Sequence, residues 1–298
     1  MRQRIAVIGL PFFGRRVARS LRQEGFRARY VPHPGRDPLA WLRAAPVLAQ
    51  ADLVYTIGSS ARTWGPADVL AKLRKRIVMH WAGTDVLHAL RDWQAGRASK
   101  GLLRRAHHWA AAPWLVEELE PMGVRAEPRA LPMVIKTGTD LPLPETFRVL
   151  VFLATEPHSA YDISGTMQVI ESLPDIPFVM VGGYRPAEIP DNLEVVGWVE
   201  DMQPQYARTS AYLRLVHHDA MSHSVIEALG YGRQVLWSYE IPGVTRVEGP
   251  EHAVEVLREL AANADTQELN ATGKETAAQF HPSVIIPAAA EAMRELLE

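Results

Sequence analysis

Short β-rich runs alternate with stretches of helical spacing along almost the whole chain. In the first half, the run at residues 5–9 ends in glycine, and residues 15–23 then have helical spacing. Strands that alternate with helices are typical of parallel sheets built from βαβ units. The sequence therefore predicts an α/β protein. The strands expected in this half are residues 5–9, 29–31, 53–58, 77–80 and 108–111, and the helices are 15–23 and 39–50.

A polar stretch with two prolines, residues 136–144, interrupts this alternation and is the best linker candidate. The pattern then restarts, which predicts two doubly wound domains with a cleft between them. The 298 residues suit two domains of roughly 150 residues each. In such sheets, ligands bind at the carboxyl ends of the strands. The strands expected here are residues 148–154, 178–181, 193–197, 211–216 and 235–238, and the helices are 163–173, 222–231, 251–262 and 287–298.

Composition excludes several classes of protein. The chain has no cysteine, which removes disulfides, thiol nucleophiles and Cys-ligated metals and fits a reducing compartment. No run approaches 18 apolar residues, so no membrane-spanning helix is expected. The apolar start is interrupted by Pro11 and lacks a small-residue cleavage site, so it is typical of a first strand rather than a signal peptide. We therefore expect a cytoplasmic protein.

Charge is distributed unevenly. Residues 1–144 carry 23 Lys and Arg against 11 Asp and Glu, whereas residues 145–298 carry 9 against 23. Two interpretations remain open. The halves attract each other across their cleft, or the basic half meets an anionic substrate or the inner membrane surface. Nucleic acid is not expected, because no recognised nucleic-acid-binding pattern accompanies the charge.

The segment 217–236 carries the most chemical information. A strand ends at polar residues, and a helix then begins with Ser222 as its cap. Asp219 and Glu227 have seven residues between them. A helix N-terminus suits a diphosphate, and a carboxylate one turn further on can accept hydrogen bonds from a ribose diol. The alternative is a capped surface helix with an incidental acid.

This segment resembles the donor domain of GT-B glycosyltransferases, most closely the retaining family-4 group. That group has two acids with seven residues between them, then Glu-Ala, a helix and Gly-x-Pro-Val. Asp219 and Glu227-Ala228 take the acidic positions, and residues 232–235 take the closing one, with Gln234 for proline. In the first half, residues 80–86 resemble the family's His-x-x-Gly-(Ser/Thr)-Asp motif, and residues 9–14 its first glycine loop.

The resemblance implies a GT-B fold with two Rossmann-like domains facing across a cleft. Residues 1–140 would form the acceptor-side domain, residues 147–275 the donor domain, and residues 276–298 a helix crossing back to the first. It also implies transfer of a sugar, with retention and without a bound metal, from a UDP- or GDP-sugar to a glycan, lipid or small-molecule acceptor.

The same resemblance assigns roles to individual residues. Glu227 would bind the ribose and Asp219 the donor sugar, and Ser222, His223 and Ser224 would offer backbone donors to the diphosphate. His80 and Asp85 would line the cleft as catalytic residues on the acceptor side. Two glycine-ended segments would lie near the donor and its base: Gly182, Gly183, Gly197 and Trp198.

The chain departs from the family where an Arg and a Lys usually neutralise the departing diphosphate. Residues 154–162 contain neither cation, and residues 145–273 contain no lysine. Developing charge on the leaving group must still be stabilised. The candidates are the helix N-terminus and five side chains: Arg185, Arg233, His158, Arg15 and Arg16. Two alternatives stay open, a non-catalytic relative that binds a nucleotide, glycan or partner enzyme, and a sugar-nucleotide epimerase.

Three further features have competing interpretations. His80 is either a site residue or a buried histidine with satisfied hydrogen bonds, and Asp85 either lines the cleft or caps the helix that follows. The histidines 217, 218 and 223 lack an established metal-ligand spacing, so no metal site is expected. Residues 91–109 mix cations with tryptophan and leucine, which suits either an anionic membrane surface or a solvated helix followed by a strand.

Overall fold

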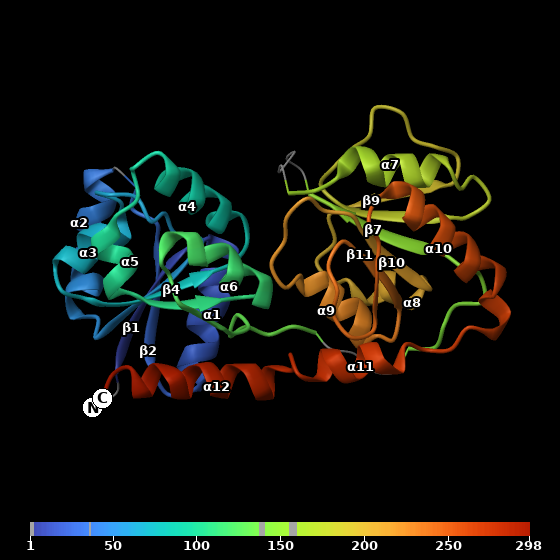
Figure 1. Ribbon diagram of the computed structural model, residues 1–298. Coiled ribbons are helices and arrows are strands. Elements are labelled where there is room, and N and C mark those ends of the chain that lie inside the picture. The colour runs from blue at the N-terminus through green and yellow to red at the C-terminus, as the bar shows by residue number, and fades with distance from the viewer. Residues whose placement is uncertain (1–2, 36, 137–140, 155–159) are drawn as a thin grey trace. The chain divides into compact units, whose positions relative to one another are not determined.

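A computed structural model describes residues 3–35, 37–136, 141–154 and 160–298. The chain divides into two compact units (Figure 1). Unit 1 comprises Met1–Val134 and Pro282–Glu298, and unit 2 comprises Ile135–His281. Residues 137–140 of the expected linker, and most of the expected cation loop including His158, lie outside the described residues. Each unit holds a six-stranded sheet in which all strand pairs are parallel.

The sheet of unit 1 has the order β2-β1-β3-β4-β5-β6. The central strands β1, β3 and β4 are nearly continuous apolar runs, as expected for parallel strands that are covered on both faces. The strands of this sheet are β1 (Arg4–Gly9), β2 (Arg27–Pro32), β3 (Leu53–Ile57), β4 (Arg76–Trp81), β5 (His107–Ala110) and β6 (Ala126–Pro128).

Several helices of unit 1 begin with a proline that the sequence prediction did not place at a helix start. The first helix starts at Pro11, four residues before its expected start, because proline fits the first helical position. The helices of this unit are α1 (Pro11–Gln23), α2 (Pro38–Gln50), α3 (Pro66–Lys72), α4 (Thr84–Gln94), α5 (Lys100–Arg105), α6 (Pro113–Leu119), a 3₁₀ turn at Glu120–Met122, and α12 (Pro282–Glu295).

The last helix, α12, belongs to unit 1 although it follows unit 2 in the chain, and it packs against α1 (Figure 1). The Arg76 guanidinium donates to the Leu296 carbonyl at 2.6 Å, and Arg294 donates to the Glu24 carbonyl at 2.9 Å. Pro287, expected to open this helix, instead lies inside it. The fold of unit 1 is therefore completed by the chain's C-terminal segment.

Unit 2 has the strand order β12-β11-β10-β7-β8-β9, the order of a dinucleotide-binding Rossmann sheet when read by position in the chain. Its strands are β7 (Val149–Leu153), β8 (Phe178–Gly182), β9 (Leu193–Gly197), β10 (Ala211–Arg214), β11 (Gln234–Trp237) and β12 (Val244–Arg246). Its helices are α7 (Ile163–Glu171), α8 (Gln203–Ala207), α9 (His223–Gly230), α10 (Pro250–Ala262) and α11 (Ala271–Ala278), with a 3₁₀ turn at Ala264–Thr266.

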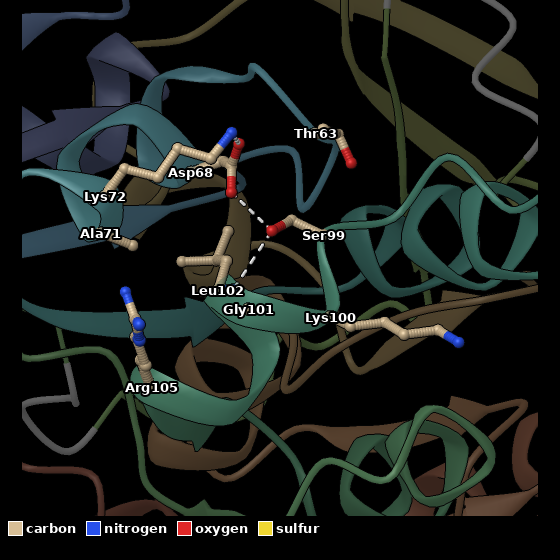
Figure 2. A pocket seen from close by; sticks show the side chains of 9 residues that line it. All are labelled: Thr63, Asp68, Ala71, Lys72, Ser99, Lys100, Gly101, Leu102 and Arg105. Carbon is tan, nitrogen blue, oxygen red and sulfur yellow. Dashed lines mark hydrogen bonds and ion pairs between the residues drawn. The ribbon is translucent and has the colours of Figure 1, made fainter.

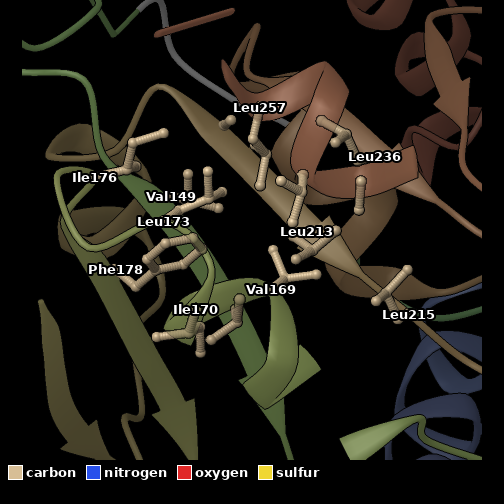
Figure 3. Close-up of a cluster of buried hydrophobic side chains, with 14 of the residues drawn as sticks. Val149, Val169, Ile170, Leu173, Ile176, Phe178, Leu213, Leu215, Leu236 and Leu257 are labelled. Carbon is tan, nitrogen blue, oxygen red and sulfur yellow. The ribbon is translucent and has the colours of Figure 1, made fainter. Parts of the chain in front are cut away.

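Helices cover both faces of this sheet. One face packs against α7 and α10 in a core that includes Leu213, Val169 and Leu257 (Figure 3). On the other face, the Tyr212 hydroxyl meets the Ser224 hydroxyl of α9 at 2.7 Å. Since successive side chains of a strand point to opposite faces, Arg214 lies on the α9 face together with Tyr212. The strand β10 therefore carries core residues on one side and polar residues toward α9 on the other.

Candidate functional site

The donor-side candidate residues of unit 2 lie at or after the carboxyl ends of β8, β9 and β10, and β10 lies next to β7 in the sheet. The chain order reverses between these two neighbouring strands, and ligands of doubly wound sheets bind in the crevice at such a switch point. The segment that follows β10 contains Asp219 and Ser222, and α9 then begins with His223 and Ser224. The candidate donor site therefore lies at this end of the strands.

The N-terminus of α9 faces this end of the strands. Ser222 occupies the cap position, as predicted, but its hydroxyl makes no capping hydrogen bond. It lies 3.0 Å from the Ser224 hydroxyl, which in turn meets Tyr212. The hydroxyls of the segment thus bond to one another and to the sheet.

Glu227 lies in the second turn of α9 and is half-buried. The Tyr206 hydroxyl of α8 shares its one proton between the Glu227 carboxylate at 3.3 Å and the Ser224 carbonyl at 3.1 Å. Burial raises the pKa of the Glu227 carboxyl to about 7, although the Tyr206 hydroxyl and the Lys136 backbone N–H lower it. A carboxylate held this way can accept hydrogen bonds from a diol, and close to neutral pH it also takes up a proton.

Sequence reasoning missed Tyr206. Its ring is fully buried and stacks on Tyr231 with ring centres 5.1 Å apart. Nothing in the local pattern distinguished it from an ordinary core residue, because its partner Glu227 follows 21 residues later.

Asp219 is joined to a residue that the sequence analysis did not single out. Its Oδ2 accepts from Nε of Arg214 at 2.6 Å, and the two side chains are 14% and 8% exposed. Its Oδ1 accepts from the Ala220 backbone N–H at 3.0 Å. The Arg214 guanidinium also lies 4.9 Å from the ring centre of Tyr161, beyond the carboxyl end of β7. The signal that could have revealed Arg214 is a lone cation within the apolar run of a central strand.

Two of the glycines expected near the donor, Gly182 and Gly197, occupy backbone conformations that favour glycine. Gly182 has φ +105°, and a Cβ there would come within 2.0 Å of the Leu153 carbonyl oxygen, so only glycine fits against β7. Gly183 follows it and is half-buried. Gly197 has φ +89° and lies against the Arg185 guanidinium. Beside it, the Trp198 side chain is 68% exposed and offers an open apolar ring.

In unit 1, His80 is enclosed. It is 1% exposed, its Nδ1 bonds to the Tyr55 hydroxyl, and its Nε2 bonds to the Arg129 carbonyl at 2.8 Å. Burial lowers the pKa of its imidazole to about 3, so it is neutral. Both ring nitrogens are therefore engaged, and these contacts favour the interpretation of a buried histidine with satisfied hydrogen bonds.

Asp85 lies in the first turn of α4, where both carboxylate oxygens accept from the Ala82 backbone N–H at 3.0 and 3.2 Å. Burial raises the pKa of this carboxyl to about 6, against the opposing effect of the neighbouring backbone N–H groups. The backbone N–H groups of Gly83 and Val86, at the start of α4, also act on this carboxylate, which is the geometry of the capping interpretation.

Among the expected cations, Arg233 lies at the amino ends of the strands, opposite the candidate donor site. It precedes β11, is fully buried, and donates from Nη2 to the carbonyls of Leu141 and Pro142 at 3.1 and 3.0 Å. Burial lowers the pKa of its guanidinium to about 10. Arg233 therefore holds the segment that enters unit 2 and does not reach the carboxyl ends of the strands, which corrects its assignment as a cation for the diphosphate.

Arg15 and Arg16 in α1 lie over aromatic rings of their own unit. The Arg15 guanidinium is 5.7 Å from the ring centre of Tyr30, and that of Arg16 is 3.7 Å from the ring centre of Phe12. Both side chains are exposed at the start of α1, beyond the carboxyl end of β1.

The basic segment 91–109 forms the end of α4, a turn, α5 and β5. Two of the nearby cations share one carboxylate, because buried Asp92 pairs with Arg62 at 2.6 Å and with Arg97 at 3.0 Å. A hollow of about 320 Å³ opens between α3 and α5 (Figure 2). Inside it, Asp68 pairs with Lys72 at 2.8 Å and accepts from Ser99. This hollow is lined by residues of α3 and α5 and by Thr63 of the loop that follows β3.

No group of three or more His, Asp or Glu side chains that could hold a metal occurs in the described parts of the chain. Within those same ranges, no helix is long and apolar enough to cross a membrane.

Neither a family model nor a curated protein matches this chain. Solved structures do. A sucrose-phosphate synthase from Thermosynechococcus elongatus is 14% identical, with 99% of each chain covered and a TM-score of 0.71. The chain has the GT-B fold.

Two further structures share this fold. The pneumococcal O-GlcNAc transferase GtfA, solved with UDP and GlcNAc, is 12% identical with a TM-score of 0.64. The alignment covers 87% of this chain and 60% of GtfA, so this chain spans a little over half of that protein. The calicheamicin glycosyltransferase CalG4 is 15% identical over 100% of this chain and 99% of its own, with a TM-score of 0.50.

Proposed function

We propose that this protein is a glycosyltransferase that moves a sugar from a nucleotide-activated donor to an acceptor. The observation that carries the proposal is the half-buried Glu227 carboxylate, held by Tyr206 behind the N-terminus of α9 at the switch point of a Rossmann-ordered sheet. An anion-binding helix end and a diol-binding carboxylate one turn apart match the spacing of diphosphate and ribose in a nucleotide.

In this proposal the Glu227 carboxylate accepts hydrogen bonds from the two ribose hydroxyls. The backbone donors at Ser222, His223 and Ser224 and the positive end of α9 bind the diphosphate. The exposed ring of Trp198 and the glycine-ended turns at Gly183 and Gly197 border the base. GtfA, which has the same fold, was solved with UDP, and this favours UDP as the first nucleotide to test.

We further propose that transfer retains the configuration of the sugar. The bond from the anomeric carbon to the phosphate oxygen breaks, and the bond from that carbon to the acceptor oxygen forms on the same face. The proton of the acceptor hydroxyl passes to the departing diphosphate, so neither a protein base nor a resident metal is required. The acceptor is a hydroxyl of a glycan, lipid or small molecule.

Thermal unfolding with UDP, GDP and ADP, for wild type and Glu227→Gln, tests the donor site. A ligand at about 100 times its Kd stabilises the folded state by about 2.7 kcal/mol. One nucleotide should stabilise the wild type and not the variant. If none does at millimolar concentration, or if the variant responds equally, this donor site is wrong.

The absence of lysine from residues 145–273 favours a second candidate, a nucleotide- or glycan-binding relative without transfer activity. The two are separated by incubating the protein with the donor sugar of the nucleotide that binds. Formation of a glycoside supports the transferase. Binding without turnover supports the second candidate, and free nucleoside diphosphate without a glycoside indicates hydrolysis or epimerase-like chemistry.

Peripheral contact of unit 1 with an anionic membrane is a separate proposal. Large apolar side chains are exposed after three neighbouring strands of its sheet, at Leu10, Phe12, Leu39, Leu42 and Trp64. With the cations nearby, they suit a lipid surface better than residues 91–109 alone. Sedimentation with anionic vesicles should be lost in Leu39→Ser/Leu42→Ser; equal sedimentation of both proteins would contradict the idea.

A further inference from the structure

A departing nucleoside diphosphate develops negative charge that the protein must stabilise. In unit 2 the question is which cation does so, since Lys136, beside Glu227, pairs with Asp201 at 2.7 Å, Lys274 lies on α11, and residues 145–273 lack lysine. The arginines of this unit are distributed over the amino and carboxyl ends of the strands and one helix. They are Arg148, Arg185, Arg208, Arg214, Arg233, Arg246 and Arg258.

Their place in the fold removes most of them. Arg148 and Arg233 directly precede β7 and β11, and Arg208 ends α8 shortly before β10, so all three lie at the amino ends of the strands. Arg258 lies on α10 and donates to the Ser172 carbonyl at 3.3 Å.

Three arginines remain at the carboxyl ends, Arg185 after β8, Arg214 in β10 and Arg246 in β12. Arg185 and Arg246 are exposed, and β12 is the outermost strand, separated from β10 by β11. Only Arg214 belongs to a strand that borders the switch point itself.

The contacts of Arg214 also favour a role at the switch point. The Tyr212 hydroxyl contacts Arg214 and also meets the Ser224 hydroxyl at the start of α9. Tyr161, beside the guanidinium, comes from the segment after β7. The guanidinium is thus connected both to the N-terminus of α9 and to the loop of the neighbouring strand. These two elements flank the crevice in which a diphosphate would lie.

We propose that Arg214 is the cation that binds the donor diphosphate and that Asp219 is its positioning residue. The inference rests on the proposed function. Asp219 accepts from Nε of Arg214 at Oδ2 and from the Ala220 N–H at Oδ1, and in this proposal its carboxylate orients the guanidinium. Nε is bound to Asp219 and the Tyr212 hydroxyl contacts the guanidinium, and in this proposal the remaining N–H groups of the Nη1–Nη2 fork donate to phosphate oxygens.

The test compares ligands that differ only in the diphosphate, UDP against uridine, or the corresponding guanosine or adenosine pair if that nucleotide binds. Affinities are measured by calorimetry or NMR titration for wild type and for Arg214→Gln. We expect the affinity for the nucleoside diphosphate to fall on the order of 10- to 100-fold, as for loss of a charged hydrogen-bond donor, and the affinity for the nucleoside to stay unchanged. Arg214→Lys should lose part of this affinity, because lysine keeps the positive charge but lacks the paired N–H donors of the guanidinium.

A lone Arg214→Gln leaves the Asp219 carboxylate buried without its partner, which can unfold the protein. The double variant Arg214→Gln/Asp219→Asn removes both charges and keeps the experiment interpretable. Arg246→Gln is the matched control, an arginine at the carboxyl end of a strand that should bind the diphosphate like wild type. Asp219→Asn alone should weaken binding of the nucleoside diphosphate and of its sugar conjugate by the same factor.

The outcomes separate the two levels of the argument. If no nucleotide binds the wild type, the proposed function is wrong, and so is the role proposed for Arg214. If the wild type binds and Glu227→Gln does not, but the folded double variant binds the nucleoside diphosphate as well as wild type, the donor site stands and the role of Arg214 is wrong. If Asp219→Asn weakens only the sugar conjugate, Asp219 contacts the sugar and is not a positioning residue.

Discussion

Replacing Glu227 by Gln should make the protein more stable while removing nucleotide binding. The carboxyl has a pKa of about 7 in the folded protein against a reference value of 4.5, chiefly because of burial. Folding therefore favours the protonated form. The contribution of this carboxyl is fully favourable below pH 4.5, and it is lost as pH rises toward 7. Gln keeps the shape and an acceptor for the Tyr206 hydroxyl, but it carries no charge to desolvate.

The size of the effect follows from the shift. Each unit of pKa difference corresponds to about 1.4 kcal/mol, so a difference of roughly 2.5 units destabilises the folded wild type by about 3 kcal/mol at pH 8.5. At pH 5 the same relation leaves under about 1 kcal/mol. We expect Glu227→Gln to exceed the wild type in free energy of unfolding by these amounts.

Urea unfolding at pH 8.5 and pH 5, without ligand, measures both differences. Glu255→Gln, an exposed carboxylate on α10, is the matched control and should change stability little at either pH. The reasoning is refuted if Glu227→Gln is no more stable than wild type at pH 8.5, or if its advantage is the same at both pH values. A stabilised variant that no longer binds nucleotide would identify Glu227 as a carboxylate kept at the expense of stability.

Three further predictions concern the surrounding structure. Tyr206→Phe removes the hydroxyl that donates to Glu227, so it should raise the pKa of that carboxyl further and destabilise unit 2 by about 1–2 kcal/mol. An unchanged pH midpoint of nucleotide binding would contradict this prediction. Gly182→Ala should cost over about 3 kcal/mol, because its Cβ meets the Leu153 carbonyl, whereas Gly25→Ala, at φ +91° with nothing within 4 Å, should cost about 1 kcal/mol; equal melting temperatures for the two variants would rule out the steric argument. His80→Gln should flatten the loss of stability on acidification from pH 6.5 to about 3, since unfolded His80 takes up a proton that the folded residue does not; acid unfolding curves that fall equally would count against an enclosed neutral imidazole.

The sequence by itself determined the two parallel sheets and the position of the α9 segment. Alternation between strand and helix patterns is a local property, and the bounds of β9 agree with the prediction because glycine ends that apolar run. Ser222 was predicted at the start of α9 and Glu227 within it, since a cap residue and helical spacing act over a few residues.

Only the tertiary structure decided which side chains meet. Arg214 and Asp219 are close in sequence, but their pairing depends on the β10 strand turning Tyr212 and Arg214 toward α9 while Leu213 enters the core. The enclosure of His80 needs Tyr55 and Arg129 from other strands and loops. Such contacts join residues across the sheet, and their free energies depend on burial and on the exact partner. Local spacing specifies neither, which is why the charge chemistry of this site emerges only once the chain is folded.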